Sequence, residues 1–546
     1  MQLVEIRDLD GPNQFLLQPA IKVAFVATAD DRSPDAIAAL GARLEPLGVD
    51  TDDRESGDWP IGELLMAAAI LLHERSGLPE PELTWTPLET TDHVALAFGW
   101  EHRRFGLEVG RVLAAVATGE PLDLHPTLDR LGELLATTEA DDRPRLLRDA
   151  DRTRPLIGVT GTNGKTTTTR LIAHMLRSTG RHVGWATTAG VYIDGELVLE
   201  GDYTGPQGAW RVFDEPKVDA AILETARGGI LLRGLAYESN DVSVFTNVSP
   251  DHLGLHGIET EDGLAQVKSV VVRVTRSGGY AVLNADDPRV RGAASGLHAS
   301  VFWITQEPEN PTVLAHLRTG GRALLVRDGV MIEARGSREH PLLEVTAVPI
   351  TFGGTARHMV ENTLCAAAAC LALGLPPAEI VAALTSFGTD PDHNAGRLHR
   401  YEVNGATVIL DYAHNVVGLT HLLELAARYR TGTGRLIAII GTAGDRTDEV
   451  LREMGRVAAT ASDLVLVKET HRYLRGRASP AEMNAAFVDG IVAAGDTPYE
   501  IIESELGALE RALHDLHPGD VIAMMCIEES VAARDLVSGL ASPKPA

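Results

Sequence analysis

The segment TGTNGKTTTT, residues 160–169, has the residue types of a loop that binds phosphate groups. It follows the apolar run 155–159 and precedes a helix-type pattern, which is the strand, turn and helix order that such a loop needs. Backbone N–H groups of the turn and of the helix N-terminus can converge on anionic oxygens. Lys165 can balance charge on the β- and γ-phosphates, and the Thr166 hydroxyl can join Mg²⁺. An ordinary turn between strand and helix is the alternative. The sequence predicts a nucleoside triphosphate site built from Gly161, Thr162, Asn163, Gly164, Lys165, Thr166 and Thr167.

Three further side chains that could do chemistry lie at or after expected strands. Glu224 closes the apolar run VDAAILE, and His252 follows the run VSVFTNV. A carboxylate at the carboxyl end of a parallel strand points into the crevice where ligands bind. Lys268 stands sixteen residues after His252. Taken alone, these residues also fit plainer roles: a solvated acid, a structural histidine and a salt-bridged lysine.

The elements that must position these residues fall into three regions. Residues 1–150 begin as an extended, hairpin-like segment and continue with apolar-periodic helices near 61–77 and 104–119 and a strand-like run between them. The charged run 139–155 indicates a linker. Strands and helices then alternate through 151–395, and a third region, 396–546, repeats the alternation. This rhythm predicts an α/β protein with a parallel sheet covered on both faces and a second, smaller α/β domain.

The composition narrows the classes of partner. A net charge of −27 argues against a nucleic acid, because its phosphate backbone would be repelled. Cys365, Cys370 and Cys526 form neither a disulfide framework nor a CxxC metal pair. No apolar run is long enough to cross a bilayer, and the N-terminus lacks the basic and apolar regions of a signal peptide. We therefore expect a cytoplasmic protein without a membrane partner.

The loop GTNGKTTTT resembles the phosphate loop of the Mur ligase superfamily, whose members join amines to carboxylates at the expense of ATP. Commoner phosphate loops have a glycine where this chain has Val159, whereas that family places it at Gly161. The resemblance implies ATP and two magnesium ions as cofactors. It implies that Glu224 holds magnesium and that His252 and Lys268 form a second metal site, with the lysine typically carbamylated. That modification needs an amine that loses its proton readily, through burial or nearby cations.

Later motifs resemble the same family's nucleotide contacts. Asn284 in AVLNADDP is similar to the adenine-facing segment, while Asp286 and Asp287 also fit a plain turn. The motifs NAGR and LDYAHN also resemble segments of that family. The resemblance implies that Arg397 and Asp411 contact the nucleotide's phosphate and ribose from the second domain, and that His414 and Asn415 lie near the reacting groups. The chain departs from the family pattern at Ala395 and Val416, which replace prolines, and at Met359 between His358 and Asn362.

Substrate contacts are expected mainly from basic side chains in these motifs. A guanidinium group suits a carboxylate, and Arg472, Arg475 and Arg477 form a basic cluster on an otherwise acidic chain. A solvated loop is the alternative for this cluster. The substrate residues that the resemblance implies are Thr204, Arg227, Asn415, Arg446 and Arg475.

Within the superfamily, the segments ETARGGIL and YAVLNADDP and the start IRDLDGPNQF resemble cyanophycin synthetases. Those enzymes carry an ATP-grasp domain between their N-terminal and Mur-like regions, whereas residues 139–155 bridge the gap in this chain. The expected fold is α/β, with a P-loop-type, parallel-sheet central ATPase domain, a Rossmann-like C-terminal domain and an α+β N-terminal domain. The expected limits are 1–150, 151–395 and 396–546.

The resemblance implies an ATP-dependent amide ligase that activates a substrate carboxylate as an acyl phosphate. Its substrates would be a small-molecule or short-peptide carboxylate and an amino-acid amine. A folate-type or cell-wall-type ligase, a phosphotransferase and a non-catalytic nucleotide-binding partner of a separate ATP-grasp ligase stay open as alternatives. Homo-oligomerisation is also left open.

Overall fold

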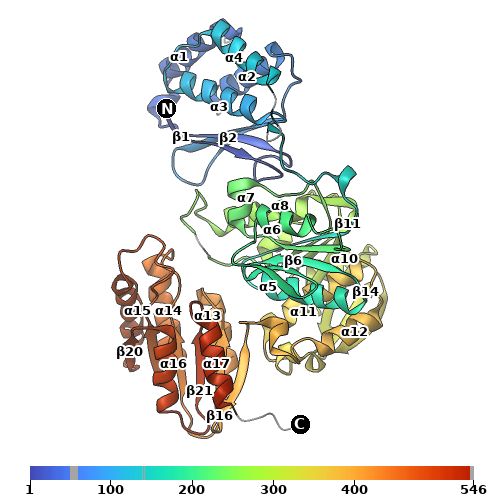
Figure 1. Ribbon diagram of the computed structural model, residues 1–546, viewed down its shortest axis with the longest axis vertical. Helices are drawn as coiled ribbons and strands as arrows, with labels where there is room; N and C mark the ends of the chain where they lie inside the picture. The colour runs from blue at the N-terminus through green and yellow to red at the C-terminus, as the bar shows by residue number, and fades with distance from the viewer. Residues whose placement is uncertain (50–59, 138, 140–141, 252, 542–546) are drawn as a thin grey trace. The chain divides into compact units, whose positions relative to one another are not determined.

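The computed structural model describes residues 1–49, 60–137, 139, 142–251 and 253–541 (Figure 1). The chain forms two compact units, which are described separately. The first comprises Met1–Leu325, Ile332–His340 and Leu364–Ile380, and the second comprises Val326–Met331, Pro341–Thr363 and Val381–Ala546. No helix within the described ranges is long and apolar enough to cross a membrane.

The first unit begins with an antiparallel four-stranded sheet in the order β1-β2-β4-β3. Ile21, Val23 and Phe25 alternate along β2, so one face of that strand is apolar and joins the core that α2 and α3 complete. The expected hairpin-like start and both expected helices are confirmed, and the α+β character follows. The elements are β1 (Gln2–Leu9), β2 (Ala20–Val26), α1 (Pro34–Leu44), α2 (Pro60–Arg75), β3 (Leu83–Pro87), β4 (His93–Gly99), α3 (Arg103–Thr118) and α4 (Leu124–Ala136).

The central part of the chain is built on an eleven-stranded sheet in the order β15-β14-β13-β12-β11-β10-β5-β9-β6-β7-β8. Every residue of β5, β6, β9 and β10 is buried, which is typical of parallel strands with both faces covered. The pairings from β6 through β9, β5, β10, β11 and β12 to β13 are parallel. The expected parallel sheet is confirmed for these strands, and at one edge it continues with β7, which pairs antiparallel with both β6 and β8. The elements are β5 (Leu156–Thr160), α5 (Lys165–Ser178), β6 (Val183–Thr187), β7 (Gly190–Ile193), β8 (Glu196–Glu200), α6 (Pro206–Phe213), β9 (Ala220–Glu224), α7 (Arg227–Arg233), β10 (Asn240–Phe245), α8 (Glu261–Arg273), β11 (Thr275–Asn284), α9 (Pro288–Gly292), β12 (Ser300–Thr305), α10 (Pro311–Arg318), β13 (Arg322–Arg327), β14 (Val330–Arg335), β15 (Arg338–Glu344), α11 (Arg357–Ala372) and α12 (Pro377–Ser386).

The C-terminal part of the second unit contains a six-stranded sheet in the order β16-β17-β21-β18-β19-β20. Only β16 runs antiparallel to its neighbour. Alternate residues of β18 face different layers: Ile437 and Ile439 join the core under α16 and α17, and Ala438 and Ile440 are also fully buried. The elements are β16 (His399–Val403), β17 (Ala406–Asp411), α13 (Val416–Ala427), β18 (Leu436–Ile440), α14 (Asp448–Ala461), β19 (Leu464–Lys468), α15 (Pro480–Ala494), β20 (Tyr499–Ile502), α16 (Glu505–His514), β21 (Val521–Met525) and α17 (Ser530–Leu540).

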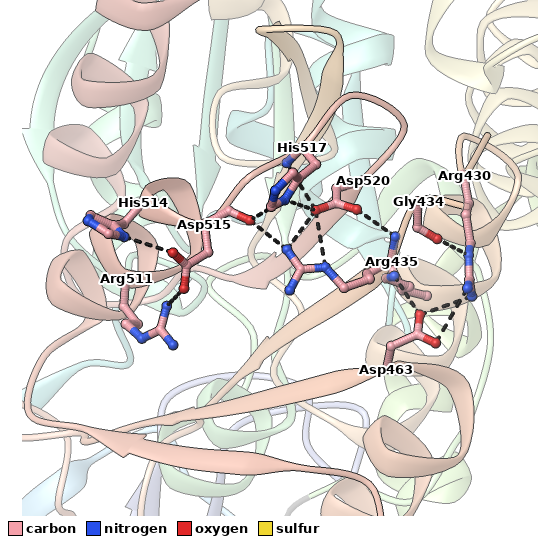
Figure 2. A network of polar contacts seen from close by, with 10 residues as sticks. Arg430, Gly434, Arg435, Asp463, Arg511, His514, Asp515, His517 and Asp520 are labelled. Carbon is pink, nitrogen blue, oxygen red and sulfur yellow. Dashed lines mark hydrogen bonds and ion pairs between the residues drawn. The ribbon is translucent and has the colours of Figure 1, made fainter. Parts of the chain in front are cut away.

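A polar network closes the amino ends of the C-terminal strands β18 and β21 (Figure 2). The buried carboxylate of Asp520 accepts the backbone N–H of Arg435 at 2.6 Å and its guanidinium at 2.8 Å. It also accepts the N–H of His517 at 3.1 Å. In such folds ligands bind at the carboxyl ends of the strands, and the network lies at the opposite end of the sheet.

Candidate active site

The phosphate loop is shaped by the segment that follows β10. Gly161 has φ +145° and Gly164 has φ +85°, values that only glycine adopts at little cost. The N–H of Thr162 donates to the Asn247 carbonyl at 2.8 Å, and the N–H of Asn163 donates to the Asn247 side chain at 2.9 Å. Since β5 and β10 are adjacent parallel strands, their carboxyl ends bring the two loops together.

Lys165 begins α5 directly after the loop. Its Nζ donates to the Thr162 carbonyl at 2.8 Å, so the ammonium group is held over the turn that is expected to bind phosphate. Thr167 lies beside it and is buried.

Glu224 is buried at the carboxyl end of β9, next to the phosphate loop. Its Oε2 accepts the Thr166 hydroxyl at 2.8 Å, and its Oε1 accepts the Thr188 hydroxyl at 2.9 Å. The Thr188 N–H also donates to Oε2, at 3.3 Å. Sequence reasoning missed Thr188, although its position directly after β6, the strand beside β9, could have revealed it.

These oxygen atoms fit a magnesium ion. Mg²⁺ prefers oxygen ligands and takes only one or two carboxylates from the protein, with water and phosphate supplying the rest. Glu224 supplies one carboxylate, and Thr166 supplies a hydroxyl hydrogen-bonded to it. Within the described ranges, no three His, Cys, Asp or Glu side chains gather as a metal site. His252, the expected ligand of a second ion, lies outside the described residues.

Lys268 projects from α8 into the same site and is almost fully buried. Its Nζ donates to the Gly161 carbonyl at 2.7 Å. Burial and the charges of Lys165 and Arg227 hold the pKa of Lys268 well below its usual value, against the opposing effects of Asp251 and Glu224. An amine under these conditions gives up its proton readily, which is the property expected from the sequence.

Thr204 and Arg227 lie on two segments that touch each other. The Ala226 N–H donates to the Thr204 carbonyl at 3.1 Å, and a Cβ on Gly229 would come within 3.0 Å of the Gly205 backbone. The Thr204 hydroxyl donates to Asp202 at 2.7 Å. Arg227 is buried and donates to the Leu255 carbonyl at 3.4 Å. Arg227 follows β9, the strand beside β5, whereas Thr204 follows β8 at the edge of the sheet.

Asn284 is buried at the end of β11, and its side-chain oxygen accepts the Asp286 N–H at 3.0 Å. Asp287 caps α9, in line with the turn role considered for it. Its second oxygen accepts the Val248 N–H at 2.7 Å, so it also ties this turn to the loop after β10.

A second cluster of expected residues lies in the second unit. The Arg397 guanidinium packs over the Tyr412 ring, 4.4 Å from its centroid. Asp411 accepts the Leu398 N–H at 2.8 Å, and burial raises the pKa of this carboxyl while Arg397 opposes the rise. His414 Nδ1 lies 3.1 Å from the Tyr412 carbonyl. Asn415 caps α13 by accepting the Gly418 N–H at 2.9 Å, which gives it a local structural role.

The basic cluster is partly neutralised by its own neighbours. Arg475 donates to Asp445 at 2.7 Å, and Arg446 contacts the same carboxylate at 3.1 Å. Arg477 pairs with Asp448 at 2.7 Å. The exposed Arg472 guanidinium makes no hydrogen bond or ion pair with the part of the chain that the structure describes. Among Arg472, Arg475 and Arg477, Arg472 is therefore the one whose guanidinium is not paired with a carboxylate of the described residues.

Comparison with known families identifies the chain. The Mur ligase middle domain matches residues 159–370, and the Mur ligase glutamate ligase domain matches residues 396–526, so the matches cover more than half of the chain. The chain belongs to the Mur ligase family. This membership and the α/β, α+β architecture confirm the resemblance stated from the motifs.

Individual relatives agree with that assignment. The cyanophycin synthetase of Synechocystis is 39% identical over 68% of this chain and 42% of its own length, so the chain spans about two fifths of that relative. A UDP-N-acetylmuramoyl-L-alanyl-D-glutamate–2,6-diaminopimelate ligase of Chlorobaculum tepidum is 29% identical over 67% of this chain and 70% of its own length.

Solved structures show the same fold at lower identity. E. coli FolC in complex with DHPP and ADP superposes with a TM-score of 0.52 at 19% identity, over 70% of this chain and 89% of that chain. A pseudomurein peptide ligase type C from Methanothermus fervidus gives a TM-score of 0.50 at 19% identity, over 77% of this chain and 85% of that chain.

Proposed function

We propose that the protein is an ATP-dependent carboxylate–amine ligase. The observation that carries this proposal is the convergence of Lys165, Lys268 and the Thr166–Glu224 pair on one phosphate loop, in a chain of the Mur ligase family. A substrate carboxylate oxygen attacks the γ-phosphorus of ATP, the bond from that phosphorus to the β,γ-bridging oxygen breaks, and ADP leaves. The amine nitrogen then attacks the acyl carbon, the bond to phosphate breaks, and the nitrogen loses a proton.

Each residue of the cluster has a distinct task. The loop amides and Lys165 bind the β- and γ-phosphates and meet the charge that moves during transfer. Glu224 and Thr166 would hold magnesium, which supplies charge neutralisation at the phosphoryl oxygens when it is bound. Arg397 and Asp411 would contact the nucleotide's phosphate and ribose, Asn284 its adenine, and His414 would lie near the reacting groups.

Lys268 is proposed to act as a carbamate. Its neutral amine nitrogen would attack carbon dioxide and lose a proton, giving an anion beside Lys165 and Arg227. Such an anion would satisfy the two cations that now lower the pKa of the amine. His252 and the carbamate would then hold a second magnesium ion.

The substrates proposed are a small-molecule or short-peptide carboxylate and an amino-acid amine. The proposed location of the protein is the cytoplasm. Thr204 and Arg227 would contact the carboxylate substrate. Arg446 and the basic cluster, Arg472, Arg475 and Arg477, would also contact a substrate carboxylate. The division at 1–150, 151–395 and 396–546 stays a prediction, with the N-terminal domain docking the carboxyl substrate. A separate ATP-grasp ligase is proposed as a partner that would extend the product, and a homo-oligomer is compatible with these roles.

Phosphate release from ATP tests the proposal. The purified protein is assayed with a panel of dipeptide carboxylates and amino acids, and ligated products are identified by mass spectrometry. We expect release that depends on both a carboxylate and an amine, with a product mass equal to the sum of the two minus water. Release that ignores both substrates refutes the ligase. A phosphorylated product that never reacts with an amine indicates a phosphotransferase, and nucleotide binding without turnover indicates a non-catalytic partner.

A further inference from the structure

The second unit contains a buried ion pair that none of the motifs explains. Lys468 Nζ lies 2.5 Å from Glu505 Oε2, and both side chains are fully buried. Lys468 ends β19 and Glu505 begins α16. The absence of a side chain at Gly441 makes room for the pair, because a Cβ there would lie 2.7 Å from Lys468 Cγ. Lys468 is also one of only six lysines in the chain.

Glu505 holds the loop that follows β21. Its carboxylate accepts the Cys526 thiol at 2.9 Å and the N–H groups of Ile527 and Glu529 at 2.9 and 2.8 Å. The Glu528 N–H also donates to it, at 3.1 Å. Burial tends to raise the pKa of Glu505, but the Lys468 charge and these donors hold it below its usual value. The carboxylate is therefore ionised and saturated with donors.

The loop after β21, residues 527–529, in turn contacts the basic loop, residues 470–477. The Glu528 carboxylate accepts the N–H of Arg472 at 2.6 Å and the N–H of His471 at 3.3 Å. Glu529 accepts the Leu506 N–H at 2.8 Å, which returns the connection to the start of α16. A continuous chain of contacts thus runs from Lys468 through Glu505 and residues 527–529 to the backbone of Arg472.

Stability alone does not account for this arrangement. A buried ion pair costs so much desolvation that apolar side chains of similar volume often stabilise a fold equally well or better. What the pair does provide is one fixed geometry, since five donors point at a single carboxylate. That geometry is transmitted to Arg472, the arginine of the basic cluster whose guanidinium is left for a ligand.

We propose that the Lys468–Glu505 pair is a positioning device that fixes the basic loop 470–477 and aims Arg472 at the carboxylate of the incoming amino acid. This assignment rests on the proposed ligase function. The amino acid is chosen because it carries an α-carboxylate whatever its side chain is. Glu505 and Lys468 themselves touch no substrate, so their effect passes through the backbone of the loop.

The test compares E505Q, R472A and the double variant E505Q/R472A with the full-length wild type. We expect E505Q to raise KM for the amino acid about tenfold, equivalent to about 1.4 kcal/mol, with kcat and KM for ATP within about twofold. R472A should give a similar rise, and the double variant should add little to it, because both changes disable one contact. The charge-neutral pair K468M/E505Q keeps the test valid if E505Q folds poorly.

Asp520→Asn is the matched control, since it removes a buried carboxylate partner from the same sheet at its opposite end (Figure 2). It should lower the melting temperature and leave KM for the amino acid unchanged. Amide hydrogen exchange gives an answer that does not need turnover: E505Q should speed exchange in residues 469–477, and the control should not. Unchanged exchange there, or equal rises in KM for ATP and amino acid, overturns the positioning role. Absence of amine-dependent turnover in the wild type refutes the proposed function instead.

Discussion

Replacing Gly161 by alanine should disable nucleotide binding, because this position carries the early glycine of the phosphate loop. A Cβ at Gly161 would lie 1.9 Å from Thr246 Oγ1, 3.1 Å from Thr246 Cβ and 3.2 Å from the Asn247 nitrogen. The backbone there has φ +145°, which L side chains rarely adopt. The Thr246 hydroxyl cannot move aside freely, since it donates to the Asn163 carbonyl at 2.7 Å.

The cost can be estimated from these contacts. An unfavourable backbone conformation costs about 1–3 kcal/mol, and overpacking costs about 1–3 kcal/mol. Loss of the Thr246 hydrogen bond adds about 0.5–1.5 kcal/mol. The loop would therefore be about 3–7 kcal/mol less favourable in its present shape. If it relaxes to another shape in the free protein, that energy must be supplied on nucleotide binding, which weakens affinity by at least about 100-fold.

Titration with a fluorescent ATP analogue, together with thermal unfolding, measures both consequences. Gly180→Ala is the matched control, since Gly180 follows the same helix with φ +83° but has open space around its Cβ position. It should cost about 1–2 kcal/mol of stability and leave affinity unchanged. Thr246→Ala in the Gly161→Ala background should restore part of the affinity. Wild-type affinity in Gly161→Ala would refute the idea that this close approach shapes the loop.

Three further predictions concern single side chains. Lys165→Ala should abolish phosphate release while leaving the melting temperature nearly unchanged, because the ammonium group covers the loop and not the core; substantial turnover would remove it from catalysis. Lys268→Ala should also be inactive, and partial recovery with added short carboxylates, measured as phosphate release, would support a carbamate there, whereas unaided wild-type rates would exclude Lys268 from the reaction. Burial and the nearby His421 lower the pKa of His358 to about 3. The pKa of His358 is therefore lower in the folded protein than in the unfolded chain. As the pH falls below about 6.5, the unfolded chain binds the proton first, so the folded state loses stability. Urea unfolding at pH 7 and pH 5 should therefore show about 2 kcal/mol less acid destabilisation in His358→Phe than in the wild type, and equal losses would contradict this.

Much of the fold could be predicted because short apolar runs and glycine-bearing turns carry local information. The runs ending at Thr160 and Glu224 are strands β5 and β9, and their carboxyl ends do meet. The antiparallel edge formed by β7 could not be predicted this way, because strand direction depends on pairing and not on composition. Thr188 was missed for a related reason: it directly follows β6, and its contact with Glu224 depends on β6 pairing with β9, a neighbour relation that must be inferred from the whole sheet.

The harder limit is that one residue type at one kind of position can serve opposite purposes. Glu224 and Glu505 are both buried carboxylates near the carboxyl ends of parallel strands. The donors to Glu224 include two threonine hydroxyls, which can rotate away and release the carboxylate to a cation. The donors to Glu505 include a buried lysine and three backbone N–H groups, whose directions are fixed by the fold. Exchangeable donors therefore mark the carboxylate that can serve a ligand, and fixed donors mark the one that holds the architecture, a distinction that only the folded chain reveals.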